Sequence, residues 1–264
     1  MYIHNLDPVL FNFYFIELRW YSLAYILGIT VGWWLSKIIL EIQVKNKKIL
    51  FNVEDFDDII SNIIISIIIG GRLGYVIFYN FKYYFNNPID ILKIWEGGMS
   101  FHGALLGIII GSFIFTKNKK ISTFVILDVI AVVAPIGIFF GRIANFINAE
   151  LYGKPSDFFW SVIFPAVDNL PRHPSQIYEA ILEGAVLFVI LIIQILNKKT
   201  RTGVCSSFFL ILYGVFRIFS EQFREPDIQI GYIFNYLTMG SALSIVMIIC
   251  GIFLLIRFKN EKNS

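Results

Sequence analysis

The chain has 264 residues, of which 57% are hydrophobic and only 16% are charged, and its formal net charge is +3. Soluble chains normally contain about 25% charged residues, so this composition excludes an ordinary soluble domain and indicates a membrane protein. The charge excess is small and falls in loops between apolar runs, so we expect no nucleic-acid partner.

Seven apolar runs are each long enough to cross a bilayer, because a hydrocarbon core of about 30 Å needs about 20 helical residues. They cover residues 20–40, 58–80, 98–116, 124–147, 176–197, 204–224 and 232–257. The runs are continuous rather than alternating, which favours helices over a β-barrel. We therefore predict an all-α integral membrane fold with seven transmembrane helices. It forms a single polytopic domain over 1–264, with a small outer loop region at about 149–175.

Basic residues in the connecting loops predict the orientation. The loops after the first, third, fifth and seventh runs are basic: Lys45, Lys47, Lys48; Lys117, Lys119, Lys120; Lys198, Lys199, Arg201; and Arg257, Lys259, Lys262. The N-terminal segment and the remaining loops hold fewer basic residues: Arg19, Lys82, Lys93, Lys154 and Arg172. Lysine and arginine collect in cytoplasmic loops. We therefore expect the N-terminus outside and the C-terminus in the cytoplasm.

With this orientation, the polar residues inside the first three predicted helices lie mainly in the outer half of the membrane. Tyr21 stands at the start of the first apolar run, and Arg72 lies within the second, between the pair Gly70-Gly71 and Gly74. His102 follows the glycines that open the third run. An imidazole is suited to proton transfer near neutral pH, so His102 is a candidate catalytic residue.

Arg142 is the most informative residue of the fourth predicted helix. A guanidinium stays charged in a protein, and burying one at the centre of a membrane helix costs roughly 2.5–3.5 kcal/mol. No acid lies one turn away on the same helix, whereas Asn145 and Asn148 follow at helical spacing. We expect an external counter-anion, for which a phospholipid phosphate is available. Arg72, Arg142 and Arg217 together would then form a cradle for an anionic head group.

The sixth predicted helix carries a polar stripe. Its members are Tyr213, Arg217, Glu221 and Arg224, spaced i, i+4, i+8 and i+11. Such a stripe must face protein or a water-filled cavity rather than lipid tails. The spacing of Arg217 and Glu221 also suits an ion pair that only fixes helix packing, and this alternative stays open.

Metal and disulfide chemistry are not expected. The three histidines are scattered along the chain, which disfavours a metal centre. Cys205 and Cys250 lie near opposite ends of the last two predicted helices and form no disulfide framework.

Six sequence runs, spread in order from residue 19 to 227, resemble the hallmark runs of prolipoprotein diacylglyceryl transferases. They are Arg19-Trp20-Tyr21, Gly70-Gly71-Arg72-Leu73-Gly74-Tyr75, Gly97-Gly98-Met99-Ser100-Phe101-His102-Gly103, Gly141-Arg142-x-x-Asn145-Phe146-Ile147-Asn148-x-Glu150, Arg172-His173-Pro174-Ser175-Gln176-x-Tyr178-Glu179 and Tyr213-Gly214-x-x-Arg217-x-x-x-Glu221-x-x-Arg224-x-Pro226-Asp227. Departures are small, with Ser22 and Ala149 where glycine is common in the family.

The resemblance implies a bacterial inner-membrane enzyme with seven helices and an outward-facing site. Such an enzyme transfers the sn-1,2-diacylglyceryl group of phosphatidylglycerol to the lipobox cysteine thiol of preprolipoproteins, forming a thioether and releasing glycerol 1-phosphate. The implied partners are phosphatidylglycerol, the lipobox segment and the membrane, with no cofactor. The predicted catalytic residues are His102, Arg142 and Arg217. The predicted substrate-binding residues are Tyr21, Arg72, Asn145, Asn148, Glu150, Glu179, Tyr213 and Glu221.

The chemistry suggests roles for these residues. A thiol is a poor nucleophile until it is deprotonated, so His102 would accept its proton, directly or through water. Alternatively, the arginine field alone activates the thiol and His102 only positions the lipid. Arg142 and Arg217 would hold the phosphate and stabilise the leaving group, and Tyr21 and Asn145 would orient the head group. Glu150 and Glu221 would hold the arginines.

Two other classes of protein can carry intramembrane arginines. An anion or lipid transporter places charged groups and broken helices at a midplane site, but it needs access to both faces, and no internal repeat is visible here. A non-catalytic scaffold would use the same residues as structural ion pairs. Transfer to a lipobox peptide distinguishes the enzyme from both.

Overall fold

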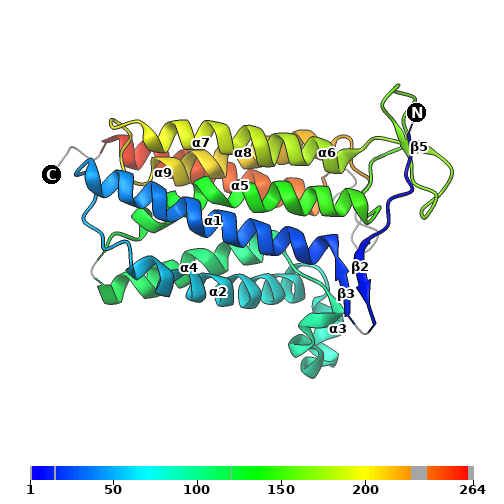
Figure 1. Ribbon diagram of the computed structural model, residues 1–264, viewed down its shortest axis with the longest axis horizontal. Coiled ribbons are helices and arrows are strands. Elements are labelled where there is room, and N and C mark those ends of the chain that lie inside the picture. Colours follow the sequence, from blue (N-terminus) through cyan, green and yellow to red (C-terminus); the bar gives the residue numbers. More distant parts are fainter. Residues whose placement is uncertain (1, 15, 120, 227–236, 261–264) are drawn as a thin grey trace. The chain divides into compact units, whose positions relative to one another are not determined.

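The computed structural model describes residues 2–14, 16–119, 121–226 and 237–260 (Figure 1). Within these ranges the chain forms two compact units, one made of Met1–Ile39 with Asp128–Ser264 and the other of Leu40–Leu127. The polar groups predicted to act together fall in both, because Arg72 and His102 belong to the second unit and the remaining predicted residues to the first.

Seven helical segments of the described chain are long and apolar enough to cross a membrane. They comprise α1 (Trp20–Lys45), α2 (Asp55–Phe78), α4 (Phe101–Lys119), α5 (Thr123–Ile147), the continuous run of α6 (Ser175–Glu179), η3 (Ala180–Val186) and α7 (Leu187–Leu196), α8 (Val204–Glu221), and α9 (Met239–Asn260). Each predicted span overlaps one of these segments. Residues 232–236 of the last predicted span lie outside the described residues.

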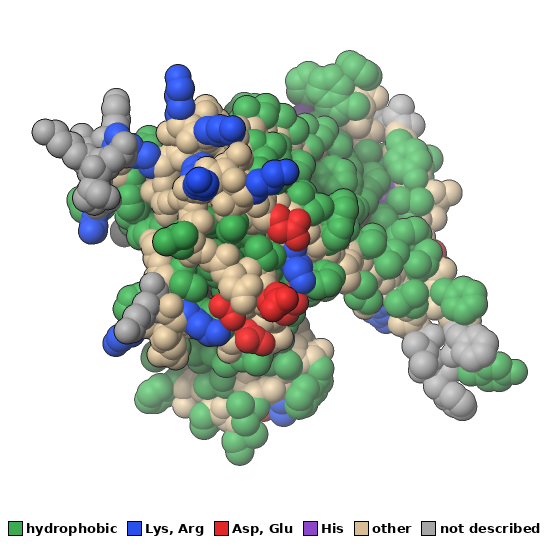
Figure 2. Space-filling view, turned by 60° about the vertical axis from the view of Figure 1, so that its left-hand side comes forward, with side chains coloured by type: hydrophobic (Ala, Val, Ile, Leu, Met, Phe, Trp, Pro, Cys, Tyr) green, Lys and Arg blue, Asp and Glu red, His purple; other side chains and the backbone are tan. Residues whose placement is uncertain are grey.

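Large apolar side chains are exposed along these helices, as expected for surfaces that contact lipid. On α9, for example, the exposed fraction is 62% for Ile249 and 66% for Phe253. Figure 2 shows hydrophobic side chains over broad areas of the visible surface, with lysine and arginine side chains at several places between them. A water-soluble domain rarely exposes apolar surface on this scale, so the composition and the fold agree.

Short strands are present as well, in addition to the predicted helices. β1 (Tyr2–Ile3) pairs in parallel with β4 (Val162–Ile163), which pairs antiparallel with β5 (Pro171–Arg172). β2 (Val9–Phe13) and β3 (Ile16–Arg19) form an antiparallel hairpin that leads into α1. Strands this short carry too little periodic signal to be recognised in a sequence, and β1 and β4 pair across a large sequence separation.

In the first unit α7 packs beside α8, and α8 beside α9 (Figure 1). The N-terminus of α8 is held by Asp128 of α5. The Asp128 carboxylate accepts hydrogen bonds from Gly203 N (2.6 Å), Ser206 N (2.8 Å) and Ser206 Oγ (2.6 Å). The first N–H groups of a helix have no partner within the helix, so a buried carboxylate from another helix caps α8 and fixes it against α5.

We expect the substitution Asp128→Asn to lower the free energy of unfolding by about 2 kcal/mol, because an amide loses the charge and one acceptor oxygen at this cap. The measurement is unfolding in mixed micelles titrated with a denaturing detergent. Asp157→Asn, in an exposed loop, is the matched control and should leave stability unchanged. Equal stability of the Asp128 variant and the wild type would show that this cap does not stabilise α8.

In the second unit α2 and α4 pack through glycines. A Cβ on Gly103 would lie 2.3 Å from Gly70 O and 2.7 Å from Gly74 Cα, so only glycine permits this backbone contact. The segment that leads into α4 bends at Gly97 and Gly98, whose φ angles are +84° and +78°. Residues between α2 and α4 form the short helices α3 (Phe81–Asn86), η1 (Pro88–Leu92) and η2 (Ile94–Glu96). The close packing and the bend fix the start of α4, where His102 lies.

Candidate functional site

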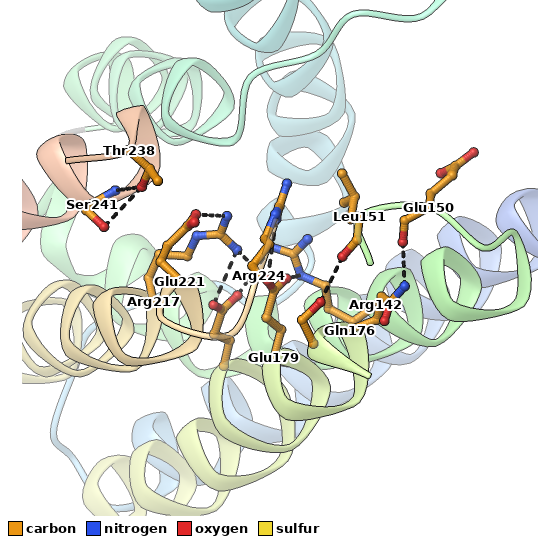
Figure 3. A network of polar contacts seen from close by, with 12 residues as sticks. Arg142, Glu150, Leu151, Gln176, Glu179, Arg217, Glu221, Arg224, Thr238 and Ser241 are labelled. Carbon is orange, nitrogen blue, oxygen red and sulfur yellow. Dashed lines mark hydrogen bonds and ion pairs between the residues drawn. The ribbon is translucent and has the colours of Figure 1, made fainter. Parts of the chain in front are cut away.

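Six charged residues of the first unit, five of them buried and one largely buried, form one network, which we call the ionic cluster (Figure 3). Its members are Arg142 on α5, Glu179 on α6, Glu183 in η3, Arg217 and Glu221 on α8, and Arg224 just after α8. The side chains of Glu179 and Glu183 have no exposed surface, and that of Arg142 is 15% exposed. Charges this deeply buried are tolerated only when they are paired.

Glu179 is the centre of the ionic cluster, because its two oxygens contact all three arginines. Oε2 lies 2.8 Å from Arg142 Nε, and Oε1 lies 3.1 Å from Arg217 Nη1 and 3.4 Å from Arg224 Nη1. One carboxylate thereby connects α5, α6 and the end of α8. Removing it would leave three guanidinium groups without their shared partner.

The other two carboxylates contact fewer arginines. Glu183 Oε2 lies 3.3 Å from Arg142 Nη2, and Glu183 Oε1 lies 3.6 Å from Arg217 Nη1. Glu221 Oε1 lies 2.5 Å from Arg217 Nη2, at the i,i+4 spacing that suggested an ion pair in the sequence. Arg217 therefore contacts all three glutamates.

Glycines allow the elements to approach closely enough for these contacts. A Cβ on Gly184, next to Glu183, would lie 2.7 Å from Phe139 Cβ on α5. A Cβ on Gly240 at the start of α9 would lie 2.6 Å from Glu221 Oε1. The π-helical turn η3 also interrupts the α-helix at this point, a feature that occurs often at functional sites. The backbone therefore permits close approach to the cluster at η3 and at the start of α9.

The amides after Arg142 form a second polar group, centred on Glu150. Asn145 Nδ2 donates to Glu150 Oε2 (3.2 Å), and Asn148 Nδ2 donates to Glu150 Oε1 (3.4 Å). Gln176 Nε2 donates to the backbone carbonyl of Glu150 (2.6 Å; Figure 3). This arrangement fixes the turn that ends α5 against the start of α6, so it fixes the position of Arg142 relative to Glu179.

Two tyrosines from the predicted substrate-binding set also lie in the first unit. Tyr213 is buried one turn before Arg217 on α8, and its ring stacks on Phe209 with centroids 5.7 Å apart. Tyr21, in the first turn of α1, packs edge to face with Tyr25 at 5.1 Å. The predicted role of Tyr21 in orienting the head group stays a prediction.

Arg72 in the second unit is fully occupied by backbone carbonyls. Nε donates to Ile91 O, Nη1 to Gly97 O and Gly98 O, and Nη2 to Asp90 O and Lys93 O. A guanidinium has five N–H groups, and five hydrogen bonds are made here. No N–H is left for a direct phosphate contact in this arrangement. The geometry instead favours a role in fixing residues 90–98, which lead into the helix of His102.

His102 lies in the first turn of α4, and its ring packs edge to face on Phe101 with centroids 5.4 Å apart. The preceding Ser100 is anchored by its backbone N–H, which donates to Gly71 O at 2.9 Å. Residue 102 is therefore fixed at a helix start by the glycine contacts of α2 and α4 and by the carbonyl network of Arg72. Its catalytic role stays a prediction.

A third polar group lies in the loop region between α5 and α6. Arg172 contacts Asp168 and Glu225, and the Arg172 hydrogen bonds lower the pKa of Asp168. The same contact with Asp168 raises the pKa of Arg172. Burial lowers the pKa of His173, which favours its neutral form. His173 Nδ1 lies 3.1 Å from the Tyr178 hydroxyl, so these residues fix the loop to the start of α6.

Two expectations about the arginines change with the structure. The predicted external counter-anion of Arg142 is not required, because Glu179 and Glu183 supply internal ones from another helix. Glu150, expected to hold an arginine, has its side-chain hydrogen bonds in the described chain to Asn145 and Asn148. Glu221 does contact Arg217, as expected. Contacts between helices cannot be predicted from the spacing on one helix, which explains the difference for Arg142.

Glu183 was not in the predicted site. The sequence did contain a signal, since Glu179 and Glu183 are four residues apart at the start of an apolar span and therefore share a helix face. Within the described residues no group of three or more His, Cys, Asp or Glu side chains is arranged to hold a metal ion. The ionic cluster is suited instead to contact with an anion, through its three guanidinium groups.

The fold and the ionic cluster define a class, namely polytopic helical membrane proteins with a buried arginine–glutamate network at the ends of their helices. Residues 8–257 match the family model of the prolipoprotein diacylglyceryl transferases. The chain belongs to the prolipoprotein diacylglyceryl transferase family.

Relatives from Rickettsia agree with this assignment, and each is named phosphatidylglycerol–prolipoprotein diacylglyceryl transferase. The Rickettsia felis protein is 50% identical over 253 residues, covering 95% of this chain and 96% of the relative. The Rickettsia bellii protein is 48% identical over 258 residues, covering 96% and 95%. The Rickettsia typhi protein is 48% identical over 263 residues, covering 99% and 100%.

Proposed function

We propose that this chain transfers the sn-1,2-diacylglyceryl group of phosphatidylglycerol to the lipobox cysteine thiol of preprolipoproteins, the first step of lipoprotein maturation. The observation that carries the proposal is the 48–50% identity, over almost the whole chain, to transferases with that name. The buried arginines supply a physical basis, because a phosphodiester head group is an anion. We propose that the whole chain acts as a single membrane domain.

In this reaction the thiol sulfur forms a bond to the terminal glyceryl carbon of the diacylglyceryl group. The bond from that carbon to the phosphate oxygen breaks, and its electron pair stays on glycerol 1-phosphate. The thiol proton passes to a base. Arg142 and Arg217 would hold the phosphate and stabilise the charge that develops on it. A guanidinium group can donate two parallel hydrogen bonds to two oxygens of one phosphate. Asn145 and Tyr21 would orient the glycerol head group.

The site is proposed to open toward the periplasmic leaflet of a bacterial inner membrane. Support comes from the position of Arg142, five residues before the end of α5 at Ile147, and from the basic loops at the opposite helix ends. Labelling of single cysteines at residues 45 and 157 with an impermeant reagent in intact cells tests the orientation. Labelling at 157 and not at 45 is expected, and the reverse pattern would contradict it.

The direct test uses purified protein in detergent with phosphatidylglycerol and a lipobox peptide. We expect a diacylglyceryl mass increase on the peptide and an equal amount of released glycerol phosphate. A transporter or a non-catalytic scaffold would release no glycerol phosphate and leave the peptide mass unchanged. That result, with a peptide that a related transferase modifies, would contradict the proposed function.

We assign removal of the thiol proton to His102, on the strength of the family resemblance of residues 97–103. The substitution His102→Gln keeps a polar side chain of similar reach but cannot accept the proton, so transfer should fall by roughly 100-fold or more. The measurement is single-turnover transfer to the lipobox peptide. Near-normal turnover would exclude His102 as the base and favour the alternative in which it only positions the lipid.

A further inference from the structure

The ionic cluster is balanced in charge before any substrate arrives. Among the described residues, the ion pairs of this cluster join three arginines, Arg142, Arg217 and Arg224, to three glutamates, Glu179, Glu183 and Glu221. All six side chains are buried or nearly so. No guanidinium charge in this group is left over for a ligand. A phosphate can therefore not be accepted simply by filling an unpaired cationic site.

Entry of a phosphodiester anion would leave the group with one excess negative charge. An uncompensated charge in a buried environment is strongly unfavourable, and such groups usually neutralise by changing their protonation state. Arginine stays protonated, so it cannot supply the adjustment. A carboxylate can, by taking up a proton from water. Anion binding in this cluster should therefore be coupled to protonation of one glutamate.

Glu183 is the carboxylate with the weakest ionic contacts. Its distances to Arg142 and Arg217 are 3.3 Å and 3.6 Å, whereas Glu221 lies 2.5 Å from Arg217. Glu179 contacts three arginines at 2.8 to 3.4 Å. A phosphate that takes guanidinium N–H groups from Arg142 and Arg217 would remove both counter-charges of Glu183. Glu179 would keep its contact with Arg224, and Glu221 would keep its short contact with Arg217.

The charged groups around Glu183 also favour it as the glutamate that becomes protonated. The charged and titratable groups that act on it are Arg142 of α5, Glu179 of α6, Tyr213 and Arg217 of α8, and Arg224 after α8. Glu179 is a like charge four residues away, and both carboxylates contact Arg142 and Arg217. When a phosphate occupies those arginines, the two carboxylates repel each other, and one of a closely spaced pair becomes protonated.

We propose that Glu183 is an internal counter-ion that a phosphodiester head group replaces, and that Glu183 takes up one proton from water as the head group binds. This proposal rests on the proposed function, since it takes phosphatidylglycerol as the anion. Glu183 acts through Arg142 and Arg217 and is a positioning residue. Its side chain holds the two guanidinium groups in place in the empty site and releases them as a neutral acid.

The test is calorimetric binding of short-chain phosphatidylglycerol to the full-length protein in phosphatidylcholine nanodiscs at pH 7. Titrations in buffers of different ionisation enthalpy give the number of protons taken up per lipid. We expect the wild type to take up one proton per bound lipid at pH 7. Because binding requires this proton, the dissociation constant should rise by up to about tenfold for each unit by which the pH is raised above 7. Glu183→Gln imitates the protonated acid, so it should bind at least as tightly, with no proton uptake and no pH dependence.

Glu54→Gln, the same chemical change at an exposed position before α2, is the matched control and should keep the wild-type proton uptake. Zero uptake by the wild type, or unchanged uptake in Glu183→Gln, would overturn the proposal. The wild-type measurement alone decides the matter if the variant does not fold. Binding and transfer without proton uptake would contradict only this inference, whereas absence of both binding and transfer would contradict the proposed function itself.

Discussion

Replacing Arg142 by lysine should lower the rate of diacylglyceryl transfer by roughly 100-fold or more, although the charge of the ionic cluster is unchanged. Removing a single hydrogen-bond donor aimed at a developing negative charge has effects of this size in other enzymes. Arg142 uses Nε for Glu179 at 2.8 Å and Nη2 for Glu183 at 3.3 Å. An ammonium group is a point charge without this planar set of donors. Its three N–H groups radiate from one atom, so it does not reproduce the positions from which the guanidinium contacts the two glutamates and a phosphate.

The measurement is single-turnover transfer from phosphatidylglycerol to a lipobox peptide, with folding checked by the detergent titration. Arg257→Lys, the same exchange at an exposed position near the end of α9, is the control and should transfer at the wild-type rate. Transfer by Arg142→Lys at the wild-type rate would remove Arg142 from phosphate binding. The role of Arg142 would then be limited to ion pairs that fix helix packing.

Replacing Glu179 by alanine should destabilise the fold more than any other single change in the ionic cluster. Breaking a buried ion pair by removing one partner costs about 3–5 kcal/mol, because the remaining charge is left buried and uncompensated. Glu179 is the shared partner of Arg142, Arg217 and Arg224, and its side chain has no exposed surface. Three guanidinium groups would then share two carboxylates, Glu183 and Glu221.

The free energy of unfolding in mixed micelles measures this loss, with Glu41→Ala at an exposed position on α1 as the control. Phosphatidylglycerol should restore part of the lost stability, because a ligand that binds only the folded state stabilises it. Stability equal to that of the wild type would show that the contacts of Glu179 contribute nothing measurable to the fold.

The spans and one ion pair of the ionic cluster could be predicted because their signals are local. Apolar runs of about 20 residues identify membrane helices without any knowledge of packing. The i,i+4 spacing of Arg217 and Glu221 likewise indicated an ion pair that the structure contains. Arg142 stood out because a guanidinium within an apolar run is costly, and His102 because it follows the glycines that open the third run. Each of these inferences uses residues that are close together in the sequence.

The sequence by itself therefore determined the class of the protein, its seven membrane helices and the polar residues within them. Only the tertiary structure decided which charges neutralise each other. Arg142 and Glu179 are 37 positions apart, and Arg72 is bonded to carbonyls 18 to 26 positions away. The free energy of a buried charge depends on its neighbours within a few ångströms, and helix packing brings those neighbours together from distant parts of the chain.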